Sequence, residues 1–418
     1  MEIEKKELEL EIKPVGEIPG ARFSQVLRDR DFLLLWSGQL FAQLADRIFI
    51  YVLMIIAYSL TKTNLGVSVP MLAFGIPSVL FASFAGVLVD RFNKRYTLVL
   101  SDILRGLMIL LIIPLVAKSL VLTFFVSFLI YTVSQFFAPA EASSIPEIVG
   151  KRNLIVANSL FMATWMISSI LGIGLGAPLV TFFGESLTFT IAAAFYFISA
   201  AFIFFVRLRY TPVFKVPLWK TFWGDLIAGL EFIRRNIVVS FSLFKLFIAT
   251  SALAVIAMLS LTYAKDILHI GERNFGYLII AVGAGMFIGL AALSWLSNYL
   301  KKGAIVVSSF LLSAVAILLL ANISNIHFAI FLVVILGLGN IFITSTLQTI
   351  LQSNIPRPIM GRVFGVQNMV INSGFTFPLL IFGAIADYFG LRAAFSVLGA
   401  ILLLTGIAGI FVPKFRTI

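Results

Sequence analysis

The chain has 418 residues, of which 60% are hydrophobic and 12% charged, and its mean hydropathy is +1.06. Soluble globular proteins are far less apolar, so the composition predicts a polytopic membrane protein. The formal net charge of +12 does not indicate a nucleic-acid partner, because Lys and Arg are placed in the connections between apolar segments. The absence of cysteine excludes disulfides, thiolate nucleophiles and cysteine-based metal sites.

The N-terminal residues 1–31 are predicted to form a cytoplasmic tail that ends in an amphipathic lead-in, RFSQVLRDRD. The mixed charge at the start has no apolar core, so we do not expect a cleavable signal peptide. Twelve apolar segments follow, each about as long as the roughly 20 residues that cross a bilayer as a helix. They are residues 32–60, 67–89, 96–117, 120–139, 155–182, 186–206, 237–262, 274–297, 303–321, 326–348, 361–386 and 391–412.

Basic residues gather in every second connection, which predicts that those connections and both termini are cytoplasmic. The connection at 207–236 divides the spans into two sets of six, at 32–206 and 237–412, with a short cytoplasmic tail at 413–418. In this central linker a helical piece from Leu218 to Phe232 is expected along the inner membrane face; a flexible linker is the alternative.

The two sets resemble each other in sequence: the stretch from Ile145 to Asn158 can be laid on the stretch from Ile355 to Asn368. Repeats of this kind are typical of secondary transporters, in which a binding site lies between two halves. The predicted fold is therefore an all-α membrane protein with twelve transmembrane helices in two pseudo-symmetric six-helix bundles.

The connection after the second segment reads GVLVDRFNKR, with Gly86, Asp90, Arg91, Lys94 and Arg95 in characteristic positions. It resembles the signature loop of the major facilitator superfamily, G-x-L-x-D-R-x-x-R/K-R/K, although Asn93 stands where glycine is usual. Further patches resemble the bacterial multidrug, macrolide and siderophore exporters of that superfamily; they are QLADRIF (43–49), SDILRG (101–106), APAEASSIPEIV (138–149) and GRVFGVQN (361–368).

The resemblance implies that this loop is a cytoplasmic gate, in which Asp90 and the basic residues latch the two halves together. A carboxylate placed against the amide-rich start of the eleventh span would have the same effect on physical grounds. The alternative is that Arg91, Lys94 and Arg95 only fix the topology.

Charged residues lie deep within some predicted spans: Asp46, Arg47 and Arg105 are near the middle of theirs, and Lys245 is two turns into the seventh. Ionisable groups at that depth are costly, about 3 kcal/mol each, and usually face a partner or a wet cavity. Asp102 and Arg105 are three residues apart and can pair on one helix face. Asp46 is a candidate for coupling to an ion; a fixed ion pair with Arg105 or Arg47 is the alternative. Lys245 is expected to extend to the inner surface.

Polar and aromatic residues also recur at spacings of three and four along three spans, which places them on one face of each. The resemblance implies that the first, fourth, seventh and tenth spans line a central cavity; contacts between helices are the alternative role. The candidate cavity residues are Gln39, Gln43, Tyr51, Met54 and Tyr58 in the first span, Ser127, Tyr131 and Gln135 in the fourth, and Asn340, Thr344 and Gln348 in the tenth.

The fifth span carries Gly172, Gly176 and Pro178, which resemble the glycine and proline motif of antiporters in this superfamily. Two departures count against proton antiport: Ala177 separates glycine from proline, and the fourth span has no arginine.

Together these features predict a monomeric exporter of amphipathic small molecules in the bacterial plasma membrane. We expect it to be powered by a gradient of protons or another ion, with no cofactor and no bound metal. A siderophore exporter or a lysophospholipid flippase of the same fold is the alternative. A membrane-embedded enzyme or a sensor is the remaining one, and an enzyme is disfavoured because no cluster of acidic or histidine residues falls at one depth.

Overall fold

The computed structural model describes residues 23–89, 92–116, 119–208, 218–296, 299–356 and 359–411. Every regular element within these ranges is a helix. The predicted N-terminal tail up to residue 22 and the tail at 413–418 lie outside the described residues. The same holds for Asp90 and Arg91 of the signature loop and for residues 209–217 of the linker.

The N-terminal half begins with a short helix and then four long ones. Asp29 accepts hydrogen bonds from the backbone amides of Asp31 and Phe32, at 2.9 and 3.1 Å, and so caps the first long helix. The elements are α2 (Phe23–Val26), α3 (Arg30–Thr61), α4 (Asn64–Val89), α5 (Lys94–Val116) and α6 (Leu120–Phe204).

The element α6 covers three predicted spans in 85 consecutive residues. A straight helix of 85 residues would be about 130 Å long, several times the thickness of a membrane. Instead α6 folds back on itself, since the ring of Phe49 on α3 packs against both Tyr131 and Phe189. We call its parts the first leg (120–149), the second leg (152–183) and the third leg (185–204). Gly184, at a φ of +75°, provides the second reversal.

The C-terminal half contains seven α-helices and two short helical turns. They are α8 (Ile237–Thr262), the π-helical η1 (Tyr263–Ile267), the 3₁₀ turn η2 (Glu272–Asn274), α9 (Gly276–Leu296), α10 (Lys302–Leu320), α11 (Ile326–Asn354), α12 (Met360–Gly374), α13 (Phe377–Phe389) and α14 (Leu391–Phe411), so that α12 and α13 together take the place of one predicted span.

This predicted span, 361–386, is divided in the structure. The break falls at Phe375 and Thr376, immediately before Pro378 in the first turn of α13. Proline has no amide proton and its ring excludes the preceding turn, so a continuous helix through this position is disfavoured.

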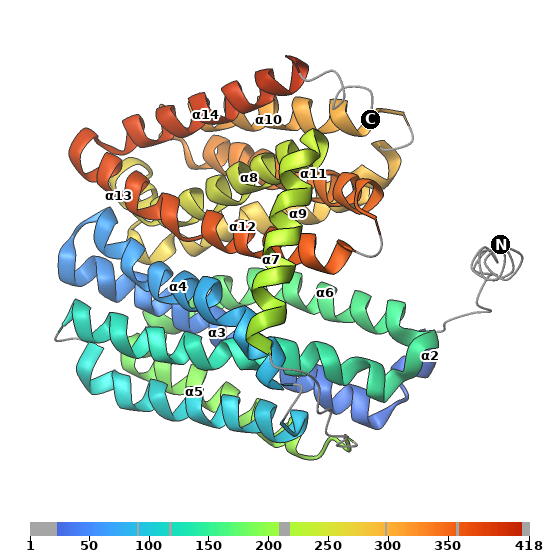
Figure 1. The fold of residues 1–418 in the computed structure, drawn as a ribbon. Helices are drawn as coiled ribbons and strands as arrows, with labels where there is room; N and C mark the ends of the chain where they lie inside the picture. Colours follow the sequence, from blue (N-terminus) through green and yellow to red (C-terminus); the bar gives the residue numbers. More distant parts are fainter. Residues whose placement is uncertain are drawn as a thin grey trace, which may run out of the picture.

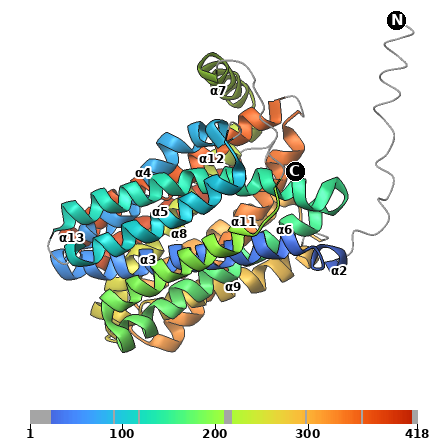
Figure 2. The ribbon, with the colours of Figure 1, turned by 90° about the horizontal axis from the view of Figure 1, so that it is seen from below.

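The two halves lie side by side as separate groups of helices, the first coloured blue to green and the second yellow to red (Figure 1). α7 (Leu218–Arg235) connects them and runs across the direction of the other helices. In the view from below, α7 stands at the edge of the helix bundles (Figure 2). Gly229 of α7 lies against the backbone of Arg362 at the start of α12.

Ten helices in the described part of the chain are long and apolar enough to cross a membrane. Large apolar side chains such as Phe182, Leu111 and Leu404 are exposed, at 81, 68 and 66%. Such surfaces are unfavourable in water and suit a lipid environment. An integral membrane protein is thus supported, while the count of twelve spans and the position of the termini stay predictions.

Close backbone contact between helices depends on glycine at several positions, most tightly between α9 and α11. A Cβ atom added at Gly337 would lie 2.0 Å from the carbonyl oxygen of Val282, and one at Gly285 would lie 2.0 Å from that of Val334. Because backbone cannot move aside as a side chain can, these two helices could not approach so closely with larger residues.

The substitution Gly337→Ala is therefore expected to destabilise the protein by about 1–3 kcal/mol through overpacking. Thermal unfolding in detergent, followed by the loss of the monodisperse peak in size-exclusion chromatography, measures the effect. Gly365→Ala on α12 is the matched control, because a Cβ at Gly365 meets no atom within 4 Å. Equal melting temperatures for the two variants would contradict the packing argument.

Candidate functional site

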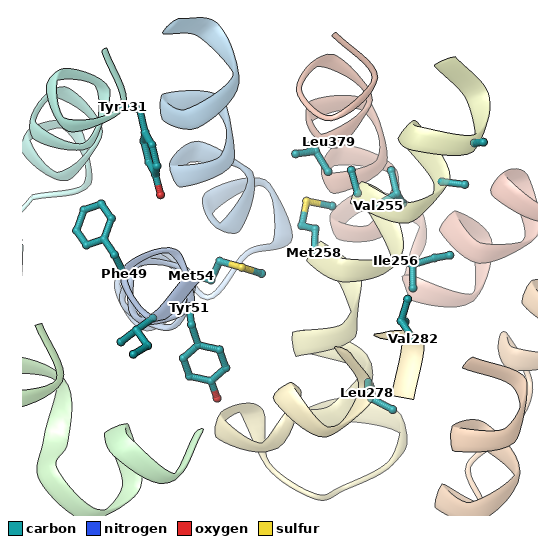
Figure 3. Close-up of a cluster of buried hydrophobic side chains, with 14 of the residues drawn as sticks. Phe49, Tyr51, Met54, Tyr131, Val255, Ile256, Met258, Leu278, Val282 and Leu379 are labelled. Atoms are coloured by element: carbon teal, nitrogen blue, oxygen red, sulfur yellow. The ribbon is translucent and has the colours of Figure 1, made fainter. Parts of the chain in front are cut away.

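A cavity of about 240 Å³ lies between the two halves. Figure 3 shows its surroundings: Tyr51 and Met54 on α3 and Tyr131 on α6 stand on one side, with Met258 on α8 and Val282 on α9 on the other. The full lining is Asp46, Arg47, Ile50, Tyr51, Met54, Met71, Phe74, Tyr131, Ser169, Leu253, Ala254, Ala257, Phe275, Ile279, Val282, Gly283, Met286 and Phe375.

The two walls of this cavity differ in chemistry. The N-terminal half contributes the charged pair Asp46 and Arg47 together with Tyr51 and Tyr131. Among the lining residues, the C-terminal half contributes apolar side chains and glycine, from α8, α9, Phe275 and Phe375. A solute between the halves would therefore meet charge on one side and an apolar surface on the other, which suits an amphipathic molecule.

Arg105 is the centre of a buried charge cluster in the N-terminal half. Its Nη2 atom donates to Asp102 Oδ1, one turn away on α5, and its Nη1 atom lies 3.6 Å from Asp46 Oδ2 on α3. Ser199 on the third leg of α6 donates to the other oxygen of Asp102 at 2.5 Å. Arg105 and Asp102 are 1 and 0% exposed, so the guanidinium is paired where an unpaired charge would be costly.

Two aromatic rings enclose the same guanidinium. The Cζ atom of Arg105 lies 4.7 Å from the ring centre of Phe137 and 4.4 Å from that of Tyr196. Rings at this distance stabilise a cation through their negative faces. Tyr196 also donates its hydroxyl hydrogen to Asp46 Oδ1. Asp46 connects this cluster to the cavity, because its side chain is 31% exposed and lines the cavity wall.

The glycines predicted in the fifth span lie on the second leg of α6 and control the distance to α3. A Cβ at Gly172 would lie 2.4 Å from the Cβ of Arg47, and one at Gly176 would lie 2.5 Å from the ring of Tyr51. Pro178 follows within the same helix. These glycines therefore set the place of two cavity residues.

Of the predicted cavity residues, Tyr51, Met54 and Tyr131 line the cavity wall. The structure places the others elsewhere. Gln39 and Ser127 are buried, and the side-chain oxygen of Gln43 is buried and accepts no hydrogen bond from the part of the chain that the structure describes. Gln135 donates to the carbonyl of Tyr131, and Tyr58 accepts from Lys265.

The stripe on the tenth predicted span, α11, faces the interior of the C-terminal half. Asn340 donates to the carbonyl of Ala249 on α8 at 3.1 Å, Thr344 donates to the carbonyl of Asn340, and Gln348 accepts from Gln367 on α12. The contacts of Asn340 and Gln348 match the alternative role of holding helices together, whereas the bond of Thr344 lies within α11. The second half's share of the cavity wall comes from α8 and α9, and α9 was not predicted to contribute.

Lys245 differs from its predicted position at the inner surface. It is fully buried, and its Nζ atom donates to the carbonyl of Thr405 on α14 at 2.9 Å. The rings of Phe241 and Phe310 lie 5.0 and 4.8 Å from it. Gly409 makes room for the ammonium group, since a Cβ there would lie 2.7 Å from Nζ. The lysine remains inside because a carbonyl and two rings replace water.

The predicted cytoplasmic gate is only partly described. Gly86 lies in α4, whereas Asp90 and Arg91 fall outside the described residues, so the latch stays a prediction. Lys94 forms an ion pair with Glu147 on the first leg of α6 and donates to the carbonyl of Ser143 at 3.1 Å. Arg95 lies over the ring of Tyr96 at 4.9 Å.

At the opposite end, the start of α4 is capped by a carboxylate from the other half. Asp387 at the end of α13 accepts from the backbone amides of Asn64 and Leu65 at 2.7 and 2.8 Å, and from Asn64 Nδ2 at 2.8 Å. Thr262 on α8 donates to Asn64 Oδ1. A carboxylate at a helix N-terminus satisfies unpaired amides and the positive end of the helix dipole. We call this region the closed end.

Tyr51 continues the closed end toward the cavity. Its ring stacks on that of Phe275, with centres 4.6 Å apart, and its hydroxyl donates to the carbonyl of Arg273. Sequence reasoning identified Tyr51 but not Asp387 or Phe275. One feature of the sequence could have identified Asp387: it is an acid directly after the apolar segment 361–386, just as Asp90 directly follows the segment 67–89.

Replacing Arg105 by glutamine is expected to destabilise the protein by about 3–5 kcal/mol, because two carboxylates lose their cation. Thermal unfolding in detergent measures it. Arg95→Gln on the same helix should change stability by less than about 0.5 kcal/mol, since its guanidinium lies at the surface end. If Arg105→Gln unfolded no more easily than this control, the cluster would not carry the stability assigned to it.

Asp387→Asn is expected to weaken the closed end by about 1.5–3 kcal/mol, the range for hydrogen bonds to a charged group. The chain has no cysteine, so a single Ala257→Cys in the cavity wall can report access without background labelling. An impermeant maleimide applied from the closed end should label this cysteine faster in the Asp387→Asn protein. Asp266→Asn, at an exposed carboxylate of the same end, is the control; equal labelling rates would contradict the gate.

Comparison with known proteins agrees with this geometry. The family described as Major Facilitator Superfamily matches residues 35–379. The chain is 23% identical over 365 residues to the multidrug efflux pump Tap of Mycolicibacterium fortuitum, covering 84% of this chain and 88% of that protein. It is 20% identical over 395 residues to macrolide efflux protein A of Streptococcus pyogenes, covering 92 and 96%.

Among solved structures, a mutant of the nucleoside transporter NupG superposes with a TM-score of 0.75 at 12% identity, covering 93% of this chain and 99% of that one. At this identity the likeness shows the fold. The family match covers most of the chain and confirms the resemblance seen in the signature loop. The chain belongs to the Major Facilitator Superfamily.

Proposed function

We propose that the protein is a secondary active exporter of amphipathic small molecules, driven by an ion gradient and working by alternating access. The observation that carries the proposal is the cavity between the halves, with Asp46 and Arg47 on one wall and an apolar surface on the other. Relatives described as multidrug and macrolide efflux proteins support the outward direction. The proposal includes twelve spans, cytoplasmic termini and a monomer in the bacterial plasma membrane.

The coupling role falls to Asp46. It borders the cavity and also contacts Arg105 and Tyr196, so protonation of its carboxyl would weaken an ion pair inside the first half. A change in the protonation of Asp46 thus alters both the charge that a solute meets and the packing of α3 against α5. This double contact supports the choice of a proton as the coupling ion.

In the predicted topology the closed end faces the outside. The hydrogen bonds of Asp387 and the stacking of Tyr51 on Phe275 then separate the cavity from the external solution. Opening of this end, with closure at the opposite end, would release a solute outward.

Inside-out vesicles containing the protein should accumulate some members of a panel of dyes, macrolides and siderophores when a pH gradient is imposed. Accumulation is expected to stop when a protonophore collapses the gradient and in the Asp46→Asn variant. The exposed carboxylate variant Asp266→Asn is the matched control and should retain accumulation. Flux that ignores the gradient, or normal gradient-driven flux by Asp46→Asn, would contradict the coupling.

The siderophores in the panel test the alternative of a siderophore exporter. Flipping of a labelled lysophospholipid in the same vesicles tests the alternative of a lysophospholipid flippase. Transport of a siderophore alone, with no dye or macrolide moved, would replace the proposed substrate class while leaving the ion coupling in place.

A further inference from the structure

Glu141 is a third acidic side chain in the Arg105 cluster, after Asp46 and Asp102, and lies on the first leg of α6. It follows Ser134 by seven residues and Phe137 by four, so all three lie on one face of the helix. Ser134 accepts from Arg105 Nη1 at 3.4 Å, and the ring of Phe137 lies against the same guanidinium. Glu141 is thus one turn further along the face that contacts Arg105.

The carboxyl group of Glu141 differs from those of Asp46 and Asp102 in its hydrogen bonds. Asp46 accepts from Tyr196, and Asp102 accepts from Ser199 and Arg105. The Oε1 atom of Glu141 is buried and accepts no hydrogen bond from the described residues. A buried carboxylate oxygen without a donor is unfavourable, whereas a protonated carboxyl group can itself donate.

The charges around Glu141 do not balance when every group is ionised. Asp102, Arg105 and Asp46 are its charged neighbours, and Arg47 interacts in turn with Asp46. Three carboxylates therefore share two guanidinium groups, and the innermost pair, Asp102 and Arg105, is 0 and 1% exposed. An uncompensated buried charge costs several kcal/mol, so the cluster is favoured with one bound proton.

The other elements packed against α6 leave this count unchanged. α4 and α2 carry no titratable residue in their described ranges. On α5, Lys94 is neutralised by Glu147 of the first leg, and Arg95 lies over the rings of Tyr96 and Phe204. The titratable groups of η2 and the start of α9 are Glu272, Arg273 and Tyr277, at the closed end, and Tyr131 and Tyr196 are neutral when protonated.

We propose that Glu141 is a proton-binding site of the transport cycle, placed between the Arg105 cluster and the end of the protein opposite the closed end. Asp46 is exposed toward the cavity, Arg105 and Asp102 are 1 and 0% exposed, and Glu141 is partly exposed although its Oε1 atom is buried. In this proposal the exchange of a proton with that end therefore takes place at Glu141. The first leg ends eight residues beyond it, near the ion pair of Lys94 with Glu147.

The site extends the proposed proton coupling, and rests on it, by giving the proton an exit. A proton that enters from the cavity binds to Asp46, and one proton leaves Glu141 to water at the opposite end. The cluster then again holds one proton on three carboxyl groups, and its net charge is restored. One proton has crossed the first half while the solute moves in the other direction.

Infrared difference spectra of the lipid-reconstituted protein, recorded on a step to alkaline pH, test the site without transport. The wild type should lose the carbonyl stretching band of a protonated carboxyl group. Glu141→Gln should lack this band, and Glu141→Asp should show it at a shifted frequency. Asp266→Asn, which removes an exposed carboxylate at the closed end, should retain it. A band unchanged in Glu141→Gln would overturn the proposal.

Vesicle transport of the panel compounds supplies the second readout. Glu141→Gln should lose accumulation driven by a pH gradient but retain exchange of labelled for unlabelled compound, because the cavity is intact. Asp266→Asn should retain both. If wild-type transport proved independent of pH, the proton coupling would fail and the infrared band would still decide whether Glu141 holds a proton. Gradient-driven transport by Glu141→Gln at the wild-type rate, or a requirement for sodium that replaces the proton, would overturn Glu141 as the exit site.

Discussion

The buried guanidinium of Arg105 organises the N-terminal half. Its partners come from α3, α5 and two legs of α6, so a single side chain connects four segments that cross the fold. In a hydrocarbon environment an arginine without such partners would be strongly unfavourable. The need to neutralise it fixes the rotation of each helix about its axis. One partner, Asp46, also borders the cavity. A solute or proton that enters the cavity can therefore reach the ion pair between Asp46 and Arg105.

The closed end depends on a different constraint, the unpaired amides at the start of α4. Asp387 satisfies them from the far half, and the small residues nearby allow the approach, since a Cβ at Gly383 would lie 3.1 Å from Leu65. In the sequence, Asp90 comes directly after α4, in the same way that Asp387 comes near the end of α13. The sequence predicts that Asp90 faces the start of α12. Two carboxylates at opposite ends of the molecule would stabilise the two closed ends alternately.

Local sequence patterns predicted much of this. Spacing of three residues identified the pair of Asp102 with Arg105, the cost of buried charge identified Asp46, and the glycines at 172 and 176 were recognised from their motif without their contacts to α3. The membrane character followed from composition. Two predicted boundaries differ in the structure. Pro378 divides the span predicted at 361–386, and α6 runs as one element through two predicted connections, with Gly184 in the left-handed region at the second.

The sequence could not show which face of each helix meets which neighbour. The polar stripe on α11 holds that helix against α8 and α12 rather than lining the cavity, and Lys245 is buried because α14 offers a carbonyl at the right depth. The interactions of Asp387 and Glu141 could not be predicted from the sequence, because their neighbours lie in distant segments. Asp387 contacts the start of α4, and the charges near Glu141 come from α3 and α5.

Proton movement coupled to solute exit is the property on which the account of Arg105, Asp46 and Glu141 depends. It is measured most directly in liposomes that contain the protein, a transported compound and a pH-sensitive dye, with the membrane potential held at zero by potassium and valinomycin. Exit of the compound down its own gradient should acidify the interior, because a proton enters in exchange. Exit at the same rate with no change in internal pH would contradict the account.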